Sequence, residues 1–219
     1  MCGRYALVAE ASELMEAFDV PLPDFEGRPR YNIAPGQRAP VVAEDRRGRR
    51  MGRLTWGLVP AWQDEPRAGL INARSESVLD KPSFREAFER RRCLVPAQGF
   101  YEWKRDGGAK RPFWIYPVEG GLVSFAGIWE RWSRPGAEPR HTYAIMTMPA
   151  SVDVAYVHDR MPVVIGALER DAWLDRDTDV ETALALVRQG PGPRLACHPV
   201  STRVNGPHED DAGLIEPVT

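Results

Sequence analysis

The sequence predicts an α+β protein with a curved, barrel-like and mainly antiparallel β-sheet core and a few flanking α-helices. Twenty prolines and 19 glycines in 219 residues exclude a helical bundle. Short β-branched or aromatic segments fill the middle of the chain, whereas segments with helical spacing are few. We expect residues 1–219 to form a single domain with an acidic C-terminal tail at about residues 207–219, since domains average ~150 residues.

Four short segments have the apolar spacing of amphipathic helices. Phe84 and Phe88 lie four residues apart in one of them, and Ser83 is the expected cap after a proline. In the last segment, Thr178 is the expected N-cap and Gly190 the expected stop. The predicted helices are residues 12–18, 83–91, 169–174 and 178–188.

Most of the remaining chain predicts β-strands, because glycine, proline or aspartate bounds each short apolar run. Two glycine-rich turns, Asp106-Gly107-Gly108 and Glu119-Gly120-Gly121, separate consecutive predicted strands and indicate β-hairpins. The predicted strands are residues 41–42, 52–58, 93–95, 99–103, 113–118, 122–129, 143–148 and 162–165.

The charge and cysteine content exclude several classes of protein. The 29 basic and 31 acidic residues give a net charge of −2, so any nucleic-acid contact must come from a local patch. No apolar run approaches the ~18 residues that a membrane span needs, and no signal sequence is visible. Three scattered cysteines are too few for a disulfide framework, which favours a cytoplasmic location.

Cys2 carries the most information about chemistry. We expect Met1 to be removed because the second residue is small, which would leave an amine and a thiol on one residue. The α-amine has a pKa of ~7.7–8.0, against ~10.4 for lysine. It can attack an aldehyde to give an imine, which the thiol closes to a thiazolidine. Two alternatives stay open at this point: a frayed terminus, and an amidotransferase-type site in which the thiol attacks an amide.

Further polar motifs accompany Met1-Cys2-Gly3-Arg4-Tyr5 along the chain. They are Tyr31-Asn32-Ile33-Ala34-Pro35-Gly36, Ile71-Asn72-Ala73-Arg74-Ser75-Glu76, Gly99-Phe100-Tyr101-Glu102-Trp103, His158-Asp159-Arg160-Met161-Pro162, His198-Pro199-Val200-Ser201 and Leu214-Ile215-Glu216-Pro217-Val218. In this order, over essentially the whole chain, they resemble the SRAP family of abasic-site processing proteins.

The resemblance implies a function in the DNA damage response. Members bind single-stranded DNA that carries an abasic site and link to it covalently and reversibly through the N-terminal cysteine. The thiazolidine product shields the lesion, and a nucleoid-associated location on damaged DNA would follow. The family is also described as a family of peptidases.

Three residues are expected to complete the catalytic site with Cys2. A histidine side chain has an ordinary pKa of ~6.5 and can donate or accept a proton near neutrality. His158 could therefore open the closed sugar to its aldehyde, and the resemblance places the catalytic histidine here. Glu102 would hold and deprotonate the Cys2 amine. Asn72 would hold a sugar hydroxyl or the carbinolamine oxygen. The alternatives without a catalytic function are a structural histidine for His158, an exposed strand glutamate for Glu102 and a turn cap for Asn72.

Several side chains are candidates for contacts with DNA. Arginines close to the catalytic positions would clamp phosphates, and aromatic or turn residues would stack on unpaired bases, worth ~1–3 kcal/mol per base. Trp56, Trp129 and Trp173 are instead expected in the core, and the basic runs 46–53 and 90–92 are expected to be solvated. The DNA-binding candidates are Arg4, Arg74, Arg160, Trp103, Trp62 and Pro35.

No cofactor or metal is expected. The sequence has no C-x-x-C, no phosphate-binding Walker loop and no dinucleotide fingerprint, so Cys93 and Cys197 are interpreted as buried structural thiols. We expect a monomer that acts on abasic single-stranded DNA without a membrane. The alternative functions are a thiol hydrolase of the peptidase or glutamine amidotransferase type and a non-catalytic single-strand-binding module.

Overall fold

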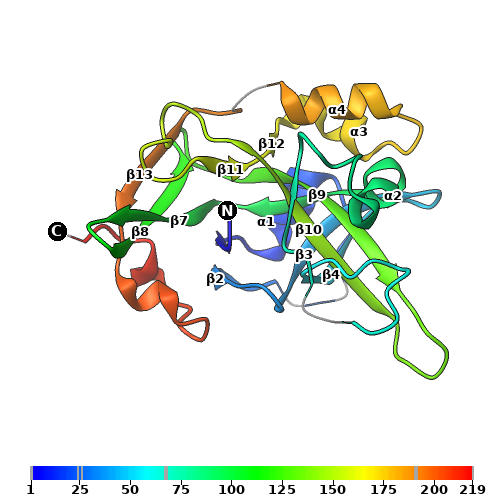
Figure 1. Ribbon diagram of the computed structural model, residues 1–219, viewed down its shortest axis with the longest axis horizontal. Helices are drawn as coiled ribbons and strands as arrows, with labels where there is room; N and C mark the ends of the chain where they lie inside the picture. The colour runs from blue at the N-terminus through cyan, green and yellow to red at the C-terminus, as the bar shows by residue number, and fades with distance from the viewer. Residues whose placement is uncertain (1, 24, 26, 67–68, 190–191, 219) are drawn as a thin grey trace.

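Residues 2–23, 25, 27–66, 69–189 and 192–218 are described by the computed structural model, and two β-sheets dominate them (Figure 1). The larger sheet has the order β11-β10-β4-β3-β6-β9-β12, with β5 also paired to β10. Because β9 pairs with β10 as well, the strands β10, β4, β3, β6 and β9 close into a ring. This closure confirms the predicted curved, barrel-like sheet. The strands are β3 (Arg38–Asp45), β4 (Gly48–Trp56), β5 (Asn72–Arg74), β6 (Arg92–Ala97), β9 (Val123–Trp132), β10 (Arg140–Pro149), β11 (Arg160–Pro162) and β12 (Val164–Ile165).

The smaller sheet has the order β13-β8-β7-β1-β2 and positions the N-terminal segment. On β1, Arg4 pairs with Tyr101 of β7, so Gly3 and Cys2 continue past the paired register towards Glu102. All pairs in this sheet are antiparallel, whereas β10 pairs in parallel with β4 and β5. The strands are β1 (Arg4–Leu7), β2 (Arg30–Ile33), β7 (Gly99–Asp106), β8 (Ala109–Pro117) and β13 (Leu195–Pro199).

The helices form where the apolar spacing predicted them, but the residues that cap them are not the predicted ones. Pro82 occupies the first turn of α2 and Lys81 the N-cap, so the expected cap at Ser83 is wrong. Asp179, rather than Thr178, caps α4, because its side chain accepts from the Thr182 N–H at 2.9 Å. The expected stop at residue 190 lies outside the described residues. The helices are α1 (Ala11–Phe18), α2 (Pro82–Arg90), α3 (Arg170–Leu174) and α4 (Val180–Arg188), with short 3₁₀ turns η1 (Ala167–Glu169), η2 (Thr202–Asn205) and η3 (Ala212–Leu214).

One of the two predicted hairpins forms and the other does not. Asp106 pairs with Ala109 across the β7–β8 turn, where Gly107 and Gly108 have φ of 52° and 92°, values that favour glycine. Residues 119–121 instead carry the chain from β8 in the smaller sheet to β9 in the larger one. The predicted strand 162–165 divides into β11 and β12, which pair with β10 and β9 respectively.

An aromatic cluster fills the space between the sheets. Tyr5 of β1 packs edge-on against Trp56 at 5.2 Å, and its hydroxyl lies 2.8 Å from the hydroxyl of Tyr143, so the two buried phenols satisfy each other. Trp56 and Trp173 are buried as expected. Trp129 is only partly buried, because it packs at the rim of the core beside a histidine ring.

The acidic C-terminal segment packs onto β2. The Asp210 carboxylate pairs with Arg30 and accepts from the backbone N–H of Tyr31 and of Asn32. Leu214 is buried, and Arg203 pairs with the neighbouring acids. The Arg203 ion pairs are exposed and contribute little individually, so the apolar contact, the backbone bonds and the less exposed Arg30–Asp210 pair hold the segment.

Arg92 corrects the expectation that the basic run 90–92 is solvated. Its side chain is 4% exposed, and burial lowers the pKa of its guanidinium. The guanidinium donates to carbonyl groups left without helical partners where α2 and α3 end. The acceptors are the carbonyl oxygens of Trp173, Phe88, Glu89, Asp175 and Thr178.

We expect Arg92→Met to lower the free energy of unfolding by about 3 kcal/mol, since each buried acceptor left unpaired costs ~1–3 kcal/mol and not all of them would stay dry. Urea denaturation followed by far-UV circular dichroism would measure this change. Arg90→Met is the control, because Arg90 is exposed and should change stability by less than ~0.5 kcal/mol. Equal losses in both variants would contradict a tethering function for Arg92.

Candidate active site

Cys2 lies in the interior rather than at a frayed end. The residue is fully buried, its carbonyl oxygen accepts from Nδ2 of Asn72 at 2.8 Å, and its Sγ lies 3.7 Å from the carbonyl oxygen of Arg4. Burial raises the pKa of the thiol, and the nearby Glu102 carboxylate raises it further. The thiol is therefore held in its neutral form.

Asn72 is held beside Cys2 by the parallel pairing of β5 with β10, which sets Asn72 opposite Ile145. Its amide nitrogen is used by the bond to Cys2. Its Oδ1 is buried and has no hydrogen-bond partner among the described residues. A buried acceptor without a donor is costly, so this oxygen is suited to accept from a hydroxyl or amine that enters the site.

Glu102 is 2% exposed, so it is not a solvated strand glutamate. It lies on β7 one residue beyond Tyr101, which pairs with the start of β1 and so brings the carboxyl close to Cys2. Burial raises the pKa of the Glu102 carboxyl, and the charge of His158 acts in the opposite direction. A carboxyl shifted towards neutrality can both accept and return a proton.

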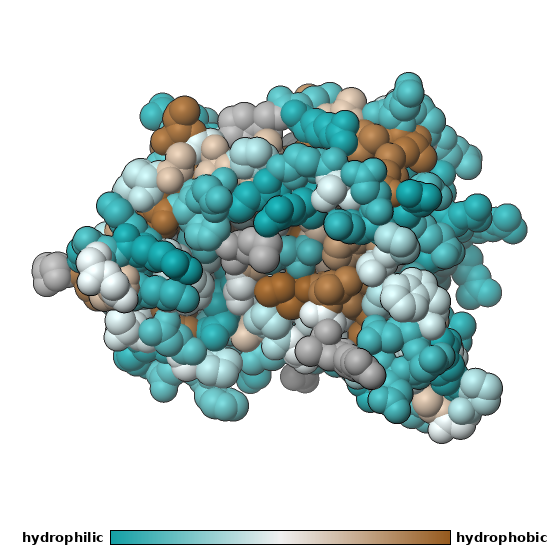
Figure 2. Space-filling model, in the orientation of Figure 1, coloured by the Kyte–Doolittle hydropathy of each residue, from teal (hydrophilic) through white to brown (hydrophobic). Residues whose placement is uncertain are grey.

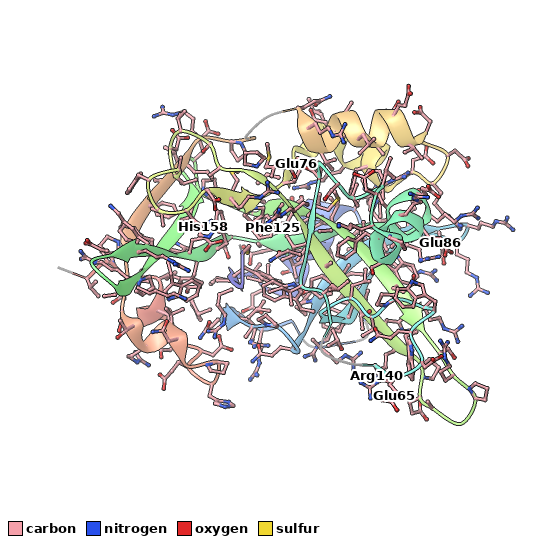
Figure 3. The ribbon with its side chains drawn as sticks, in the orientation of Figure 1. Glu65, Glu76, Glu86, Phe125, Arg140 and His158 are labelled. Atoms are coloured by element: carbon pink, nitrogen blue, oxygen red, sulfur yellow. The ribbon has the colours of Figure 1, made fainter. Side chains whose placement is uncertain are left out.

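His158 lies in the turn before β11 (Figure 3). Its Nε2 lies 4.0 Å from Oε2 of Glu102, and its Nδ1 accepts from the backbone N–H of Arg160 at 3.0 Å. That bond leaves the proton of the neutral ring on Nε2, directed at the carboxylate. Asp159 Oδ1 lies 3.0 Å from Nδ1 and would stabilise the protonated ring.

A cavity of about 550 Å³ opens beside Glu102 and His158. Trp103 lines it and is held by a 2.8 Å hydrogen bond from its Nε1 to Oδ1 of Asn205. Arg105 and Lys110 line it too, and our interpretation of the sequence missed both. The predicted turn at 106–108 was the signal that could have found them, because a two-residue hairpin sets Arg105 opposite Lys110.

The predicted arginine contacts differ in their availability. Arg74 is exposed and makes no ion pair among the described residues. Arg4 instead donates to Oδ1 of Asn32 at 2.9 Å and to backbone carbonyls of η2, which ties β1 to the C-terminal segment. A phosphate could reach Arg4 only by competing with these acceptors.

Both terminal nitrogens of the Arg160 guanidinium are also bonded to groups of the protein. It forms a two-point ion pair with Glu76 and donates to the carbonyl oxygen of Thr147 at 2.8 Å. The hydrogen bond from Arg160 lowers the pKa of the Glu76 carboxyl to about 2. The other predicted contacts are accessible: Pro35 lies in an exposed turn and Trp62 is 63% exposed.

The two remaining thiols differ in their exposure. Cys93 is fully buried as expected, but Cys197 is partly exposed and its Sγ lies 2.9 Å from the hydroxyl of Tyr156. Within the ranges that the structure describes, no three His, Cys, Asp or Glu side chains are grouped to hold a metal ion. The described helices are also too short or too polar to cross a membrane.

The fold and site together define an α+β protein in which a cysteine before the first strand meets a buried carboxyl, an amide and a histidine. The family model described as SOS response associated peptidase (SRAP) matches residues 1–207, and the chain belongs to this family.

Several curated proteins are similar to this chain over nearly all of its length. It is 36% identical over 222 residues to the abasic site processing protein YoqW of Bacillus subtilis, with 99% of each chain covered. It is 31% identical to the abasic site processing protein YedK of Escherichia coli, with 100% of each covered. It is 34% identical to the abasic site processing protein HMCES of Gallus gallus, with 100% of this chain and 78% of that protein covered.

Solved structures share the fold. A protein from Bacteroides thetaiotaomicron superposes with a TM-score of 0.89 at 23% identity, with 100% of each chain covered. A phage-related protein from Bordetella bronchiseptica superposes with a TM-score of 0.73 at 32% identity, covering 92% of this chain and 95% of that one.

Proposed function

We propose that this protein processes abasic sites in single-stranded DNA by forming a thiazolidine crosslink through Cys2, which shields the lesion during the DNA damage response. The observation that carries the proposal is the meeting of Cys2, Asn72, Glu102 and His158 at the start of β1. The names of the curated relatives support abasic DNA as the substrate. The reaction requires removal of Met1, because only then does Cys2 carry a free amine.

The first step opens the sugar. An abasic deoxyribose is mainly a closed hemiacetal, so one group must take the proton from the C1′ hydroxyl while another protonates the ring oxygen. Glu102 and His158 face each other across 4.0 Å and can share these two tasks. The product is the open-chain aldehyde, and no electron is gained or lost.

The aldehyde is then captured in two bond-forming steps. The Cys2 amine adds to C1′ to give a carbinolamine, and loss of one water molecule leaves the imine. The Sγ–H then adds across the C=N bond: sulfur bonds to C1′ and its proton goes to nitrogen. The Oδ1 of Asn72, which has no hydrogen-bond partner among the residues that the structure describes, is suited to accept from the carbinolamine hydroxyl.

The raised thiol pKa favours this order of attack. A thiol that stays protonated is a poor first nucleophile, whereas the α-amine is partly neutral near pH 7. A peptidase or glutaminase of the N-terminal cysteine type needs the thiolate to attack first. Sulfur capture also consumes the imine, from which β-elimination would otherwise break the DNA strand.

Arg74, Trp62, Trp103 and Pro35 are the contacts that we propose for the strand around the lesion, because they are accessible or line the cavity. Arg4 and Arg160 would act on the strand mainly by holding the N-terminal segment and the His158 turn in place. A phosphate could still engage them by displacing their present partners.

Incubation with three matched oligonucleotides on a denaturing gel tests the proposal. The strand with a natural abasic site should give a heat-resistant shifted band. The intact strand and a strand with a tetrahydrofuran analogue, which lacks the aldehyde, should give none. Mass spectrometry should find Met1 absent and the adduct lighter by one water than the sum of its parts. A covalent band with the tetrahydrofuran strand would refute the aldehyde chemistry.

A further inference from the structure

The β7–β8 hairpin carries four cations in an arrangement that costs the protein energy. Lys104 pairs in register with Arg111, and Arg105 with Lys110. Like charges directly opposite each other on neighbouring strands are destabilising. None of the four forms an ion pair with an acid among the described residues, and the Lys104 ammonium lies over the Tyr156 ring at 5.3 Å. An anionic ligand would relieve this repulsion.

Two of these cations belong to the cavity of the candidate active site. Arg105 and Lys110 line it together with Glu102 and His158. Both side chains are exposed, and hydrophilic side chains gather over this hairpin on the face in Figure 2. The cavity therefore runs from a buried carboxyl at one end to an exposed positive pair at the other.

The pairing of β7 explains why the cavity continues in this direction. The paired register of β1 ends at Arg4, opposite Tyr101, whereas β7 extends on to Asp106 paired with β8. The stretch of β7 from Glu102 onward therefore pairs only with β8 among the described strands, and the cavity is lined there by Glu102, Trp103 and Arg105. A chain that binds in the site can follow this edge towards Arg105.

We propose that Arg105 and Lys110 bind phosphates of the single strand next to the abasic nucleotide, on the side that leaves the site along the β7–β8 hairpin. This inference rests on the proposed function, since it takes the same strand as the ligand. Arg4 and Arg160 are already bonded to groups of the protein, whereas Arg105 and Lys110 have no acidic partner to displace within the described part of the chain. They can therefore supply uncompensated charge to the DNA backbone.

The double variant Arg105→Gln/Lys110→Gln tests the assignment by equilibrium binding to an intact single strand at several salt concentrations. Each lost phosphate contact should lower the slope of log K against log salt by ~0.7, so we expect a decrease of about 1.4. Affinity at 0.1 M salt should fall on the order of tenfold. The matched control is Arg131→Gln/Arg140→Gln, which removes the same charge at the far end of the β9–β10 hairpin (Figure 3).

Neutral methylphosphonates placed one at a time along the oligonucleotide would locate the contact. On one side of the lesion, one or two substitutions should weaken binding by the wild-type protein and have no further effect on the double variant. The melting temperature of the variant without DNA should not fall, since the like-charge pair Arg105–Lys110 is gone. A lower melting temperature would mean that the cations are structural and would overturn the assignment.

The outcomes separate this inference from the proposed function. If the wild-type protein crosslinks abasic DNA but the double variant keeps its affinity and salt slope, the phosphate site is wrong and the proposed function stands. If the slope falls as expected but no covalent band forms with wild-type protein, the strand-binding edge stands and the covalent chemistry fails. A control variant that loses as much slope as the test variant would refute a local site.

Discussion

Serine in place of Cys2 should abolish the heat-resistant crosslink with abasic DNA while leaving a reducible imine. Removal of Met1 remains possible because serine is also small, so the amine that attacks C1′ is retained. The hydroxyl cannot close a stable sulfur-containing ring. We expect no shifted band after heating, and a band of wild-type mobility when borohydride is present to reduce the imine.

The behaviour of the Cys2→Ser protein separates the two chemistries that an N-terminal cysteine can perform. If sulfur attacked first, as in a thiol hydrolase, the serine variant would show no borohydride-trapped product and wild-type protein would hydrolyse glutamine or a peptide. Cys197→Ser is the matched control: it removes a partly exposed thiol outside the site and should leave crosslinking unchanged. A heat-resistant band from Cys2→Ser would contradict the proposed ring.

The sequence predicted the local elements of the fold better than their partners. The glycine pair at 107–108 identifies a hairpin because only a few residue types accept positive φ at both positions. The similar pair at 120–121 also has positive φ, yet it joins strands of different sheets. Turn geometry depends on a few neighbouring residues, whereas the choice of sheet depends on packing that is distant in the sequence.

In the candidate site, too, the sequence predicted local chemistry better than long-range contacts. The chemistry of Cys2, Glu102 and His158 could be argued from residue type, but their meeting follows from the register of β1 with β7 and from the turn before β11. The ion pair between Arg160 and Glu76 could not be predicted, because the two residues lie 84 positions apart in the sequence. Arg92 was misjudged for the same reason, since its acceptors come from helix ends separated by more than 80 residues.

Glutamine in place of Glu102 should slow crosslink formation by about 10²- to 10³-fold, the usual contribution of a positioned acid or base. The amide has the size of the carboxyl but cannot take a proton from the hemiacetal or the amine. Single-turnover rates of crosslink formation at pH 6 to 8 would measure the effect. The part of the pH dependence that comes from ionisation of Glu102 in the wild-type protein should be absent from the pH–rate profile of the variant. Binding to intact single strands should stay within about twofold.

The same substitution should make the protein more stable at neutral pH. Burial raises the pKa of Glu102 in the folded state, so the folded protein loses stability as the pH rises above ~4.3, the value for an unfolded glutamate, and through the raised pKa. Glu102→Gln removes that loss, and its melting temperature should exceed that of wild type at pH 7 to 8 and converge with it near pH 4.

Glu76→Gln is the control with the opposite sign. Arg160 lowers the pKa of Glu76 to about 2, so this carboxylate stabilises the fold above pH ~4.3, and the contribution is lost as the pH falls towards 2. Its replacement should therefore lower the melting temperature at pH 7 and have little effect in acid. A Glu102→Gln protein that is less stable than wild type at pH 7 would mean that the carboxylate is held by partners strong enough to outweigh its burial, and a proton-transferring function would then lose its physical basis.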